Sequence, residues 1–146
     1  SFTDLLILSD TRTQKDTMAT FGGEYPGGAL YSTAAWVGAH PKEVQSLTNA
    51  IVNTLKWIHS HSAEEIMDKM PPNMVGKNKE LYLAALKNTI PMYSQTGMMD
   101  PKGADAVLAV FSEGSPDVAK AHIDVTKTYT NKFVEQAGKT TGTNAK

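Results

Sequence analysis

The sequence predicts an α/β chain that is mostly helical and contains about two strands. Two short apolar segments near the N-terminus, residues 5–8 and 29–33, have the length of strands and lack a helical period. From Pro41 onward, apolar residues recur at steps of three and four, which is the helical spacing. With 146 residues, the chain is about one domain long.

The first predicted strand, residues 5–8, contains only Leu and Ile and ends at Ser9-Asp10. A continuous apolar run of this kind is typical of a strand buried on both faces in a parallel sheet. Residues 10–28 are polar and then rich in Gly, so we expect a loop. The second strand, residues 29–33, could run into a short helix through Trp36.

Two strands alone form a marginal sheet in water. We therefore expect the chain to be the C-terminal part of a larger protein. Without that remainder, an exposed apolar strand recruits another strand, so two copies of the chain could pair through residues 1–35.

The helix predicted over residues 41–60 has the clearest pattern. Pro41 suits the first helical position. One apolar stripe follows it, and we expect this stripe to face the core: Val44, Leu47, Ile51, Leu55 and Ile58.

Four further helices are expected after this one. Ser62 and Glu65 form a capping-box pattern that opens a short helix to Met70, and two prolines follow. The others cover residues 78–93, a segment that starts at Asp100-Pro101, and residues 124–137. In the helix after Pro101 the residues expected to point inward are Ala104, Val107, Leu108 and Phe111.

These elements divide the chain into three parts. Residues 1–35 hold the hinge or crossover strands and a cleft loop, and residues 36–137 form a C-terminal helical layer. Residues 138–146 contain no large apolar side chain and are expected to be a flexible tail.

Composition excludes several classes of protein. The net charge of −1 argues against a protein that binds nucleic acid or membrane surfaces by charge. The absence of Cys excludes disulfides, thiolate metal sites and a cysteine nucleophile. The first residues show no signal peptide, although a mature exported chain would look the same.

Five segments of the sequence together resemble a known family. They are residues 4–13, the Gly-Gly-Glu-Tyr-Pro loop at 22–26, and residues 36–41, 49–58 and 123–134. In this order and spacing they are similar to the C-terminal portion of the nitrate/sulfonate/taurine-type solute-binding proteins of ABC importers. The resemblance implies a two-lobed Venus-flytrap fold, located in the periplasm or attached to a lipid anchor outside the cytoplasm. It also implies a small anionic or organic solute as the ligand, docking on an ABC permease in the membrane, no catalysis and no cofactor.

Polar residues that directly follow the first predicted strand form the main candidate site. Ligands of open α/β sheets bind outside the carboxyl ends of strands. The fork of donors on Arg12 suits a carboxylate, sulfonate or nitrate, while Ser9 and Thr11 offer hydroxyls and Asp10 could orient Arg12 or bind an amine. The structural alternative is that Asp10 and Arg12 simply pair and cap the turn.

Two tyrosines extend this candidate site. Tyr25 in the glycine-rich loop and Tyr31 in the second strand could line the same cleft, although a turn-rich connection explains the loop equally well. No metal site is expected, because His59 and His61 stand two residues apart and face different sides of a helix.

Two other functions remain open. An enzyme similar to a thiamine-pathway pyrimidine synthase shares the two-lobed architecture, and a ligand-sensing domain could use the same fold. No nucleophile elbow or paired-carboxylate pattern favours catalysis.

Overall fold

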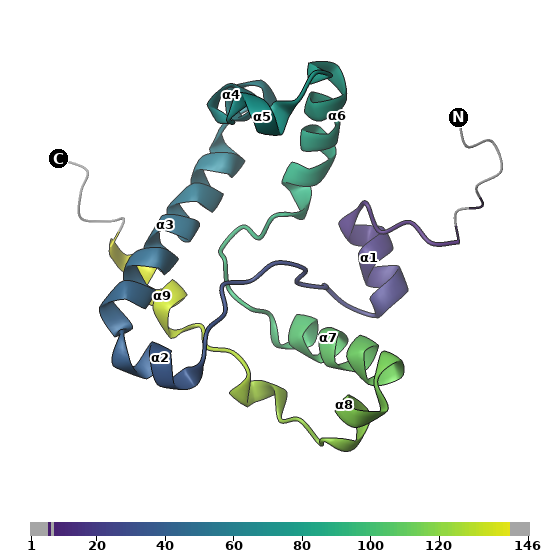
Figure 1. Ribbon diagram of the computed structural model, residues 1–146, viewed down its shortest axis with the longest axis vertical. Coiled ribbons are helices and arrows are strands. Elements are labelled where there is room, and N and C mark those ends of the chain that lie inside the picture. Colours follow the sequence, from purple (N-terminus) through teal and green to yellow (C-terminus); the bar gives the residue numbers. More distant parts are fainter. Residues whose placement is uncertain (1–5, 7, 141–146) are drawn as a thin grey trace.

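The computed structural model describes residue 6 and residues 8–140, without the side chains of residues 139 and 140. All regular secondary structure in this part of the chain is helical (Figure 1). The α-helices are α1 (Gln14–Phe21), α2 (Ala34–Ala39), α3 (Pro41–Ser60), α4 (Ala63–Lys69), α5 (Pro72–Val75), α6 (Lys79–Thr89), α7 (Pro101–Gly114), α8 (Pro116–Lys120) and α9 (Lys132–Thr140). Two 3₁₀ turns, η1 (Ile90–Met92) and η2 (Val125–Lys127), complete the set.

The predicted α/β class is wrong, because the described residues contain no strand and no sheet. Residues 29–33 form an exposed connection to α2, in which the Tyr31 side chain is 91% exposed. A strand needs a neighbouring backbone for its N–H and C=O groups, and no strand among the described residues pairs with this segment. Half of the other predicted strand, residues 5–8, lies outside the described residues. Its two described members, Leu6 and Leu8, are exposed.

Helix α1 lies inside the segment that the sequence predicted to be a loop. The Thr13 hydroxyl caps its first turn by accepting from the Asp16 N–H. Gly22 ends the helix in the left-handed conformation, with φ of 76°, which glycine adopts without a steric penalty. The glycines lie only in the last part of the predicted loop, after α1. The loop prediction for residues 10–28 is therefore wrong over the residues that form α1.

Helices α3 and α9 form the best-packed part of the molecule, at the left of Figure 1. Val44 and Val52 on α3 are buried, as are Phe133 and Ala137 on α9. The Gln45 amide donates to the Phe133 carbonyl over 2.9 Å, so a polar bond between distant parts of the chain supports the apolar contact.

The buried face of α3 differs from the predicted stripe. Val44, Thr48 and Val52 face the core, whereas Leu47 and Ile51 are 48% and 43% exposed. At about 100° per residue, the buried face is rotated by roughly 60° from the predicted one. The helix itself, Pro41–Ser60, is confirmed.

Local end signals predicted the next helices well. Ser62 and Glu65 form the expected reciprocal capping box at the start of α4. Helix α6 and η1 occupy the segment predicted over residues 78–93. Lys87 on α6 lies 2.6 Å from Glu64 on α4, which joins these two helices.

Helix α7 begins after the Asp100 cap, as predicted, and its first turns lie against residues 23–26 of the glycine-rich loop. Its buried residues are Gly103 and Ala106, whereas the expected inward Phe111 is 55% exposed. A Cβ at Gly103 would lie 3.2 Å from the Glu24 carbonyl oxygen. The absence of a side chain therefore lets residues 24–26 lie directly on α7.

The final predicted helix is wrong in its first half. Residues 124–137 contain η2, a break, and then α9, which begins at Lys132. Asp124 caps η2 by accepting from the Thr126 N–H, so the turn starts where predicted but is not continued. Helix α9 extends to Thr140, so the predicted tail is helical at residues 138–140, and residues 141–146 lie outside the described part.

Candidate ligand-binding site

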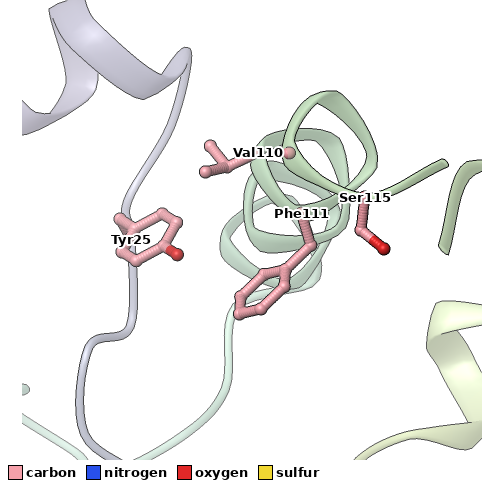
Figure 2. Close-up of a pocket in the computed structure, with 5 residues that line it drawn as sticks. Tyr25, Val110, Phe111 and Ser115 are labelled. Atoms are coloured by element: carbon pink, nitrogen blue, oxygen red, sulfur yellow. The ribbon is translucent and has the colours of Figure 1, made fainter. Parts of the chain in front are cut away.

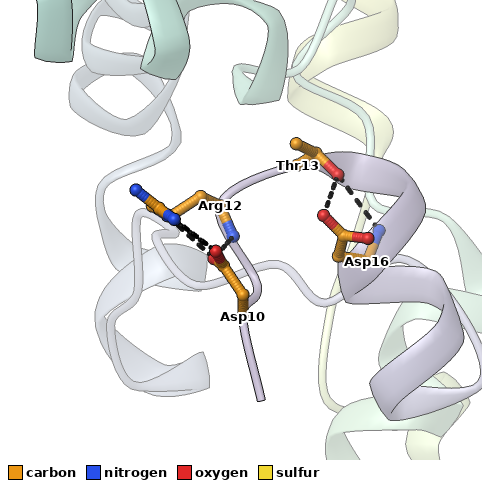
Figure 3. Close-up of polar contacts among 4 residues, drawn as sticks. All are labelled: Asp10, Arg12, Thr13 and Asp16. Carbon is orange, nitrogen blue, oxygen red and sulfur yellow. Dashed lines mark hydrogen bonds and ion pairs between the residues drawn. The ribbon is translucent and has the colours of Figure 1, made fainter. Parts of the chain in front are cut away.

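Asp10 and Arg12 form a two-pronged ion pair immediately before α1 (Figure 3). The Arg12 Nε–H donates to both carboxylate oxygens of Asp10 over 2.9 Å, and Nη2 donates to Oδ2. The Arg12 backbone N–H also donates to Oδ1 over 3.0 Å. Asp10 and Arg12 therefore pair with each other, as the alternative to ligand binding predicted. This pairing fixes the orientation of the guanidinium.

The ion pair stabilises the charged form of both groups. The hydrogen bonds from Arg12 lower the pKa of Asp10 from 3.8 to about 2. The same bonds raise the pKa of Arg12, with a smaller contribution from the nearby Asp16 carboxylate. Both side chains keep their charge throughout the neutral pH range.

The pairing leaves one edge of the guanidinium open. Asp10 occupies the edge formed by Nε and Nη2, and the Arg12 side chain is 76% exposed. In Figure 3 its far end, beyond the atoms that bind Asp10, points away from the carboxylate. An arginine has five N–H donors, so a second planar anion could bind the remaining edge.

Ser9 and Thr11 are tied to α1 and do not form a hydroxyl pair beside Arg12. The Ser9 hydroxyl lies 3.2 Å from the Thr20 hydroxyl near the end of α1. The Thr11 carbonyl accepts from the buried Thr17 hydroxyl over 3.1 Å. These two contacts hold the segment before α1 against that helix.

Tyr25 contributes to a different feature, a shallow apolar hollow of about 420 Å³. The hollow is also lined by Val110, Phe111, Gly114 and Ser115 at the end of α7 (Figure 2). The Tyr25 ring lies 4.6 Å from the ring of Phe21. The sequence analysis did not identify the α7 residues as part of a site. It assigned Phe111 to the apolar face of the helix and therefore expected its side chain to be buried.

The six candidate residues therefore do not converge on one cleft. Ser9, Asp10, Thr11 and Arg12 form one cluster, Tyr25 lines the hollow, and Tyr31 lies outside the residues that line it. The sequence expectation of one cleft depended on two strands ending at the same edge of a sheet, and that sheet is absent from the described part of the chain.

The two histidines at the end of α3 make separate contacts. His59 Nε2 lies 3.2 Å from the Ser94 carbonyl oxygen, and the His61 ring stacks on Trp57 with centroids 4.3 Å apart. Across the described residues, no three His, Asp or Glu side chains gather as a metal-binding group.

In the described part of the chain, the regular structure is all helical and an ion pair of Asp10 and Arg12 precedes α1. No protein-family model matches this chain, and no curated protein matches it. It is similar to the solved structure of a protein from Bordetella bronchiseptica RB50, with a TM-score of 0.87 and 36% sequence identity. The similarity covers 94% of this chain and 43% of that protein, so the chain spans less than half of that protein's length. None of the described helices is long and apolar enough to cross a membrane.

Proposed function

We propose that this chain is part of a non-catalytic solute-binding protein of an ABC importer, and that Arg12 contacts a small anionic solute. The main support for this proposal is the open edge of the Arg12 guanidinium, which Asp10 holds in place. In this proposal the protein works in the periplasm or on an extracytoplasmic lipid anchor, and it delivers the solute to a membrane permease. No cofactor takes part.

The geometry of Arg12 supports a planar or tetrahedral oxyanion as the ligand. Two N–H groups on one edge of a guanidinium match two oxygens of a nitrate, sulfonate or carboxylate. Asp10 already neutralises one positive charge, and Asp16 adds a second carboxylate nearby. We therefore expect hydrogen-bond geometry, more than net charge, to select the ligand.

The local charge also predicts weak binding by this segment alone. With Arg12 partly neutralised and well exposed, we expect a dissociation constant of about 1 mM or weaker, equivalent to roughly −4 kcal/mol. The resemblance to solute-binding proteins implies further contacts from residues beyond this chain. The Bordetella protein, which is more than twice as long, makes such an addition reasonable.

A nuclear magnetic resonance titration tests the proposal, because Arg12 is the chain's one arginine. Its Nε–H therefore gives a single arginine signal, which can be followed while nitrate, taurine or methanesulfonate is added. We expect this signal and the backbone amide signals of residues 11–13 to shift with saturation in the wild type. In Arg12→Ala and Arg12→Lys, which lack the arginine signal, the same backbone amides should show no saturable shift.

Lys15→Ala is the matched control, since Lys15 is an exposed cation on the adjacent α1. It should leave the titration unchanged. A linear, unsaturated shift for every anion, or equal loss in the Lys15 variant, would show that Arg12 only responds to ionic strength. Either result would contradict the proposed function.

A further inference from the structure

Helix α3 carries an apolar strip that the described fold leaves uncovered. Leu47 and Ile51 are 48% and 43% exposed, and Ile58 is half-buried. The three residues follow one another at helical spacing, and they lie beside the buried row of Val44 and Val52. The apolar surface of α3 therefore extends beyond the buried row of Val44 and Val52.

The strip is part of a larger exposed surface, because the chain as a whole exposes more area than a folded monomer of its mass. A monomeric protein of 15.8 kDa exposes about 7,300 Å², whereas this chain exposes 11,319 Å². The residues outside the described part can account for at most roughly 1,900 Å² of the difference. About 2,000 Å² remains.

An excess of this size exceeds what a transient partner would cover. A standard interface buries about 800 Å² on each partner, and only obligate interfaces bury well over 1,000 Å² on each. In addition, no large side chain among the described residues is completely buried. The exposed excess therefore has the size of a permanent interface.

We infer that the strip formed by Leu47, Ile51 and Ile58 is covered by further residues of the same polypeptide. The argument for this occupant comes from the Bordetella protein, in which a region of the same fold is accompanied by the other 57% of a longer chain. A TM-score of 0.87 means that the helices keep their arrangement in that larger setting. The inference depends on packing and does not depend on the proposed anion binding.

Single-cysteine labelling tests this inference, because the chain contains no Cys. Ile51→Cys reports on the strip. Asn53→Cys is the matched control, because it is exposed and lies about 200° away around α3. Leu47→Cys gives a second reporter on the strip. Each variant is made both in the 146-residue chain and in the complete product of its reading frame, and both are treated with a water-soluble maleimide.

In the 146-residue chain, we expect the cysteines at positions 51 and 53 to react at rates within a few-fold of each other. In the complete product, the cysteines at 47 and 51 should react at least tenfold more slowly, while the one at 53 is unchanged. Three results would overturn the inference. They are a reading frame without further residues, equal rates in the complete product, and protection of position 51 in the 146-residue chain that rises with its concentration. The last result would identify a second copy as the occupant.

Discussion

The α3–α9 pair and the N-terminal segment of residues 8–33 are stabilised in different ways. In the α3–α9 pair, buried apolar side chains and hydrogen bonds join residues far apart in sequence, such as Gln45 and Phe133. In the N-terminal segment, the side-chain bonds stay within the segment and join mostly exposed groups, such as Asp10 with Arg12 and Thr13 with Asp16. The first region stabilises the fold, while the second region arranges exposed charge.

Exposure explains why this difference matters for function. An exposed ion pair contributes little to the free energy of unfolding, because water solvates both charges. Replacing Arg12 should therefore cost little stability, whereas replacing Phe133 opens the core. The contrast between the two regions makes four predictions, ordered from the largest expected effect on stability to the smallest.

Phe133→Ala should produce the largest loss, because it removes a buried ring between α9 and α3. We expect the free energy of unfolding to fall by about 3–5 kcal/mol, or the chain to be unfolded at 25 °C. The matched control is Phe111→Ala, at a side chain that is 55% exposed. It should cost less than about 1 kcal/mol. Urea denaturation measures both, and equal losses would show that α3 and α9 do not form the main core.

Asn131→Ala should have the next largest effect. The Asn131 amide accepts from the Met99 N–H over 2.9 Å and donates to the Met99 carbonyl over 3.0 Å. Losing both bonds at a half-buried position should cost about 1–3 kcal/mol. Asn53→Ala, on the exposed side of α3, serves as the control and should stay within about 0.5 kcal/mol of the wild type. A small loss at both positions would mean that water replaces the Asn131 bonds.

Sequence patterns predicted the helix starts, whose signals lie within a few residues. They did not predict the buried face of α3, which depends on contacts between distant parts of the chain. Pro41, the Ser62–Glu65 box and Asp100-Pro101 mark helix starts within a few residues, and the structure confirms them. The buried face of α3 depends on where α9 lies. The position of α9 is set by contacts between residues far apart in the sequence. Sequence spacing alone cannot choose between the row of Val44 and Val52 and the row of Leu47 and Ile51.

The same distinction applies to the candidate site. The contact between Asp10 and Arg12 spans two residues, so a pattern of adjacent opposite charges can predict it. The hollow beside Tyr25 needs the end of α7, more than eighty residues further along the chain. The predicted strands failed for a related reason: an apolar run has strand propensity, but a strand forms only beside another backbone.

Gly103→Ala tests how the N-terminal segment is joined to the helical region. A new Cβ would lie 3.2 Å from the Glu24 carbonyl oxygen and 3.3 Å from Pro26 Cδ, so the loop would have to move away from α7. Gly114→Ala in the same helix meets nothing within 4 Å and should stabilise by about 0.5–1 kcal/mol. We expect the two variants to differ by about 1 kcal/mol or more in thermal unfolding, because crowding cancels the helix gain at Gly103. Equal stabilisation would show that residues 24–26 pack loosely on α7.

The smallest expected effect on stability concerns the Asp10–Arg12 pair, and its direct readout is the pKa of Asp10. That pKa is lowered from 3.8 to about 2, so the contribution of the pair to stability is complete above about pH 4 and is lost as the pH falls through 2. Carboxyl carbon shifts should therefore show Asp10 titrating near pH 2 in the wild type. In Arg12→Ala the midpoint should return toward 3.8, whereas Lys15→Ala should leave it near 2. A wild-type midpoint close to 3.8 would mean that the guanidinium spends most of its time away from Asp10. Arg12 would then meet an anion as a freely moving side chain, and the open edge that carries the proposed function would not be preformed.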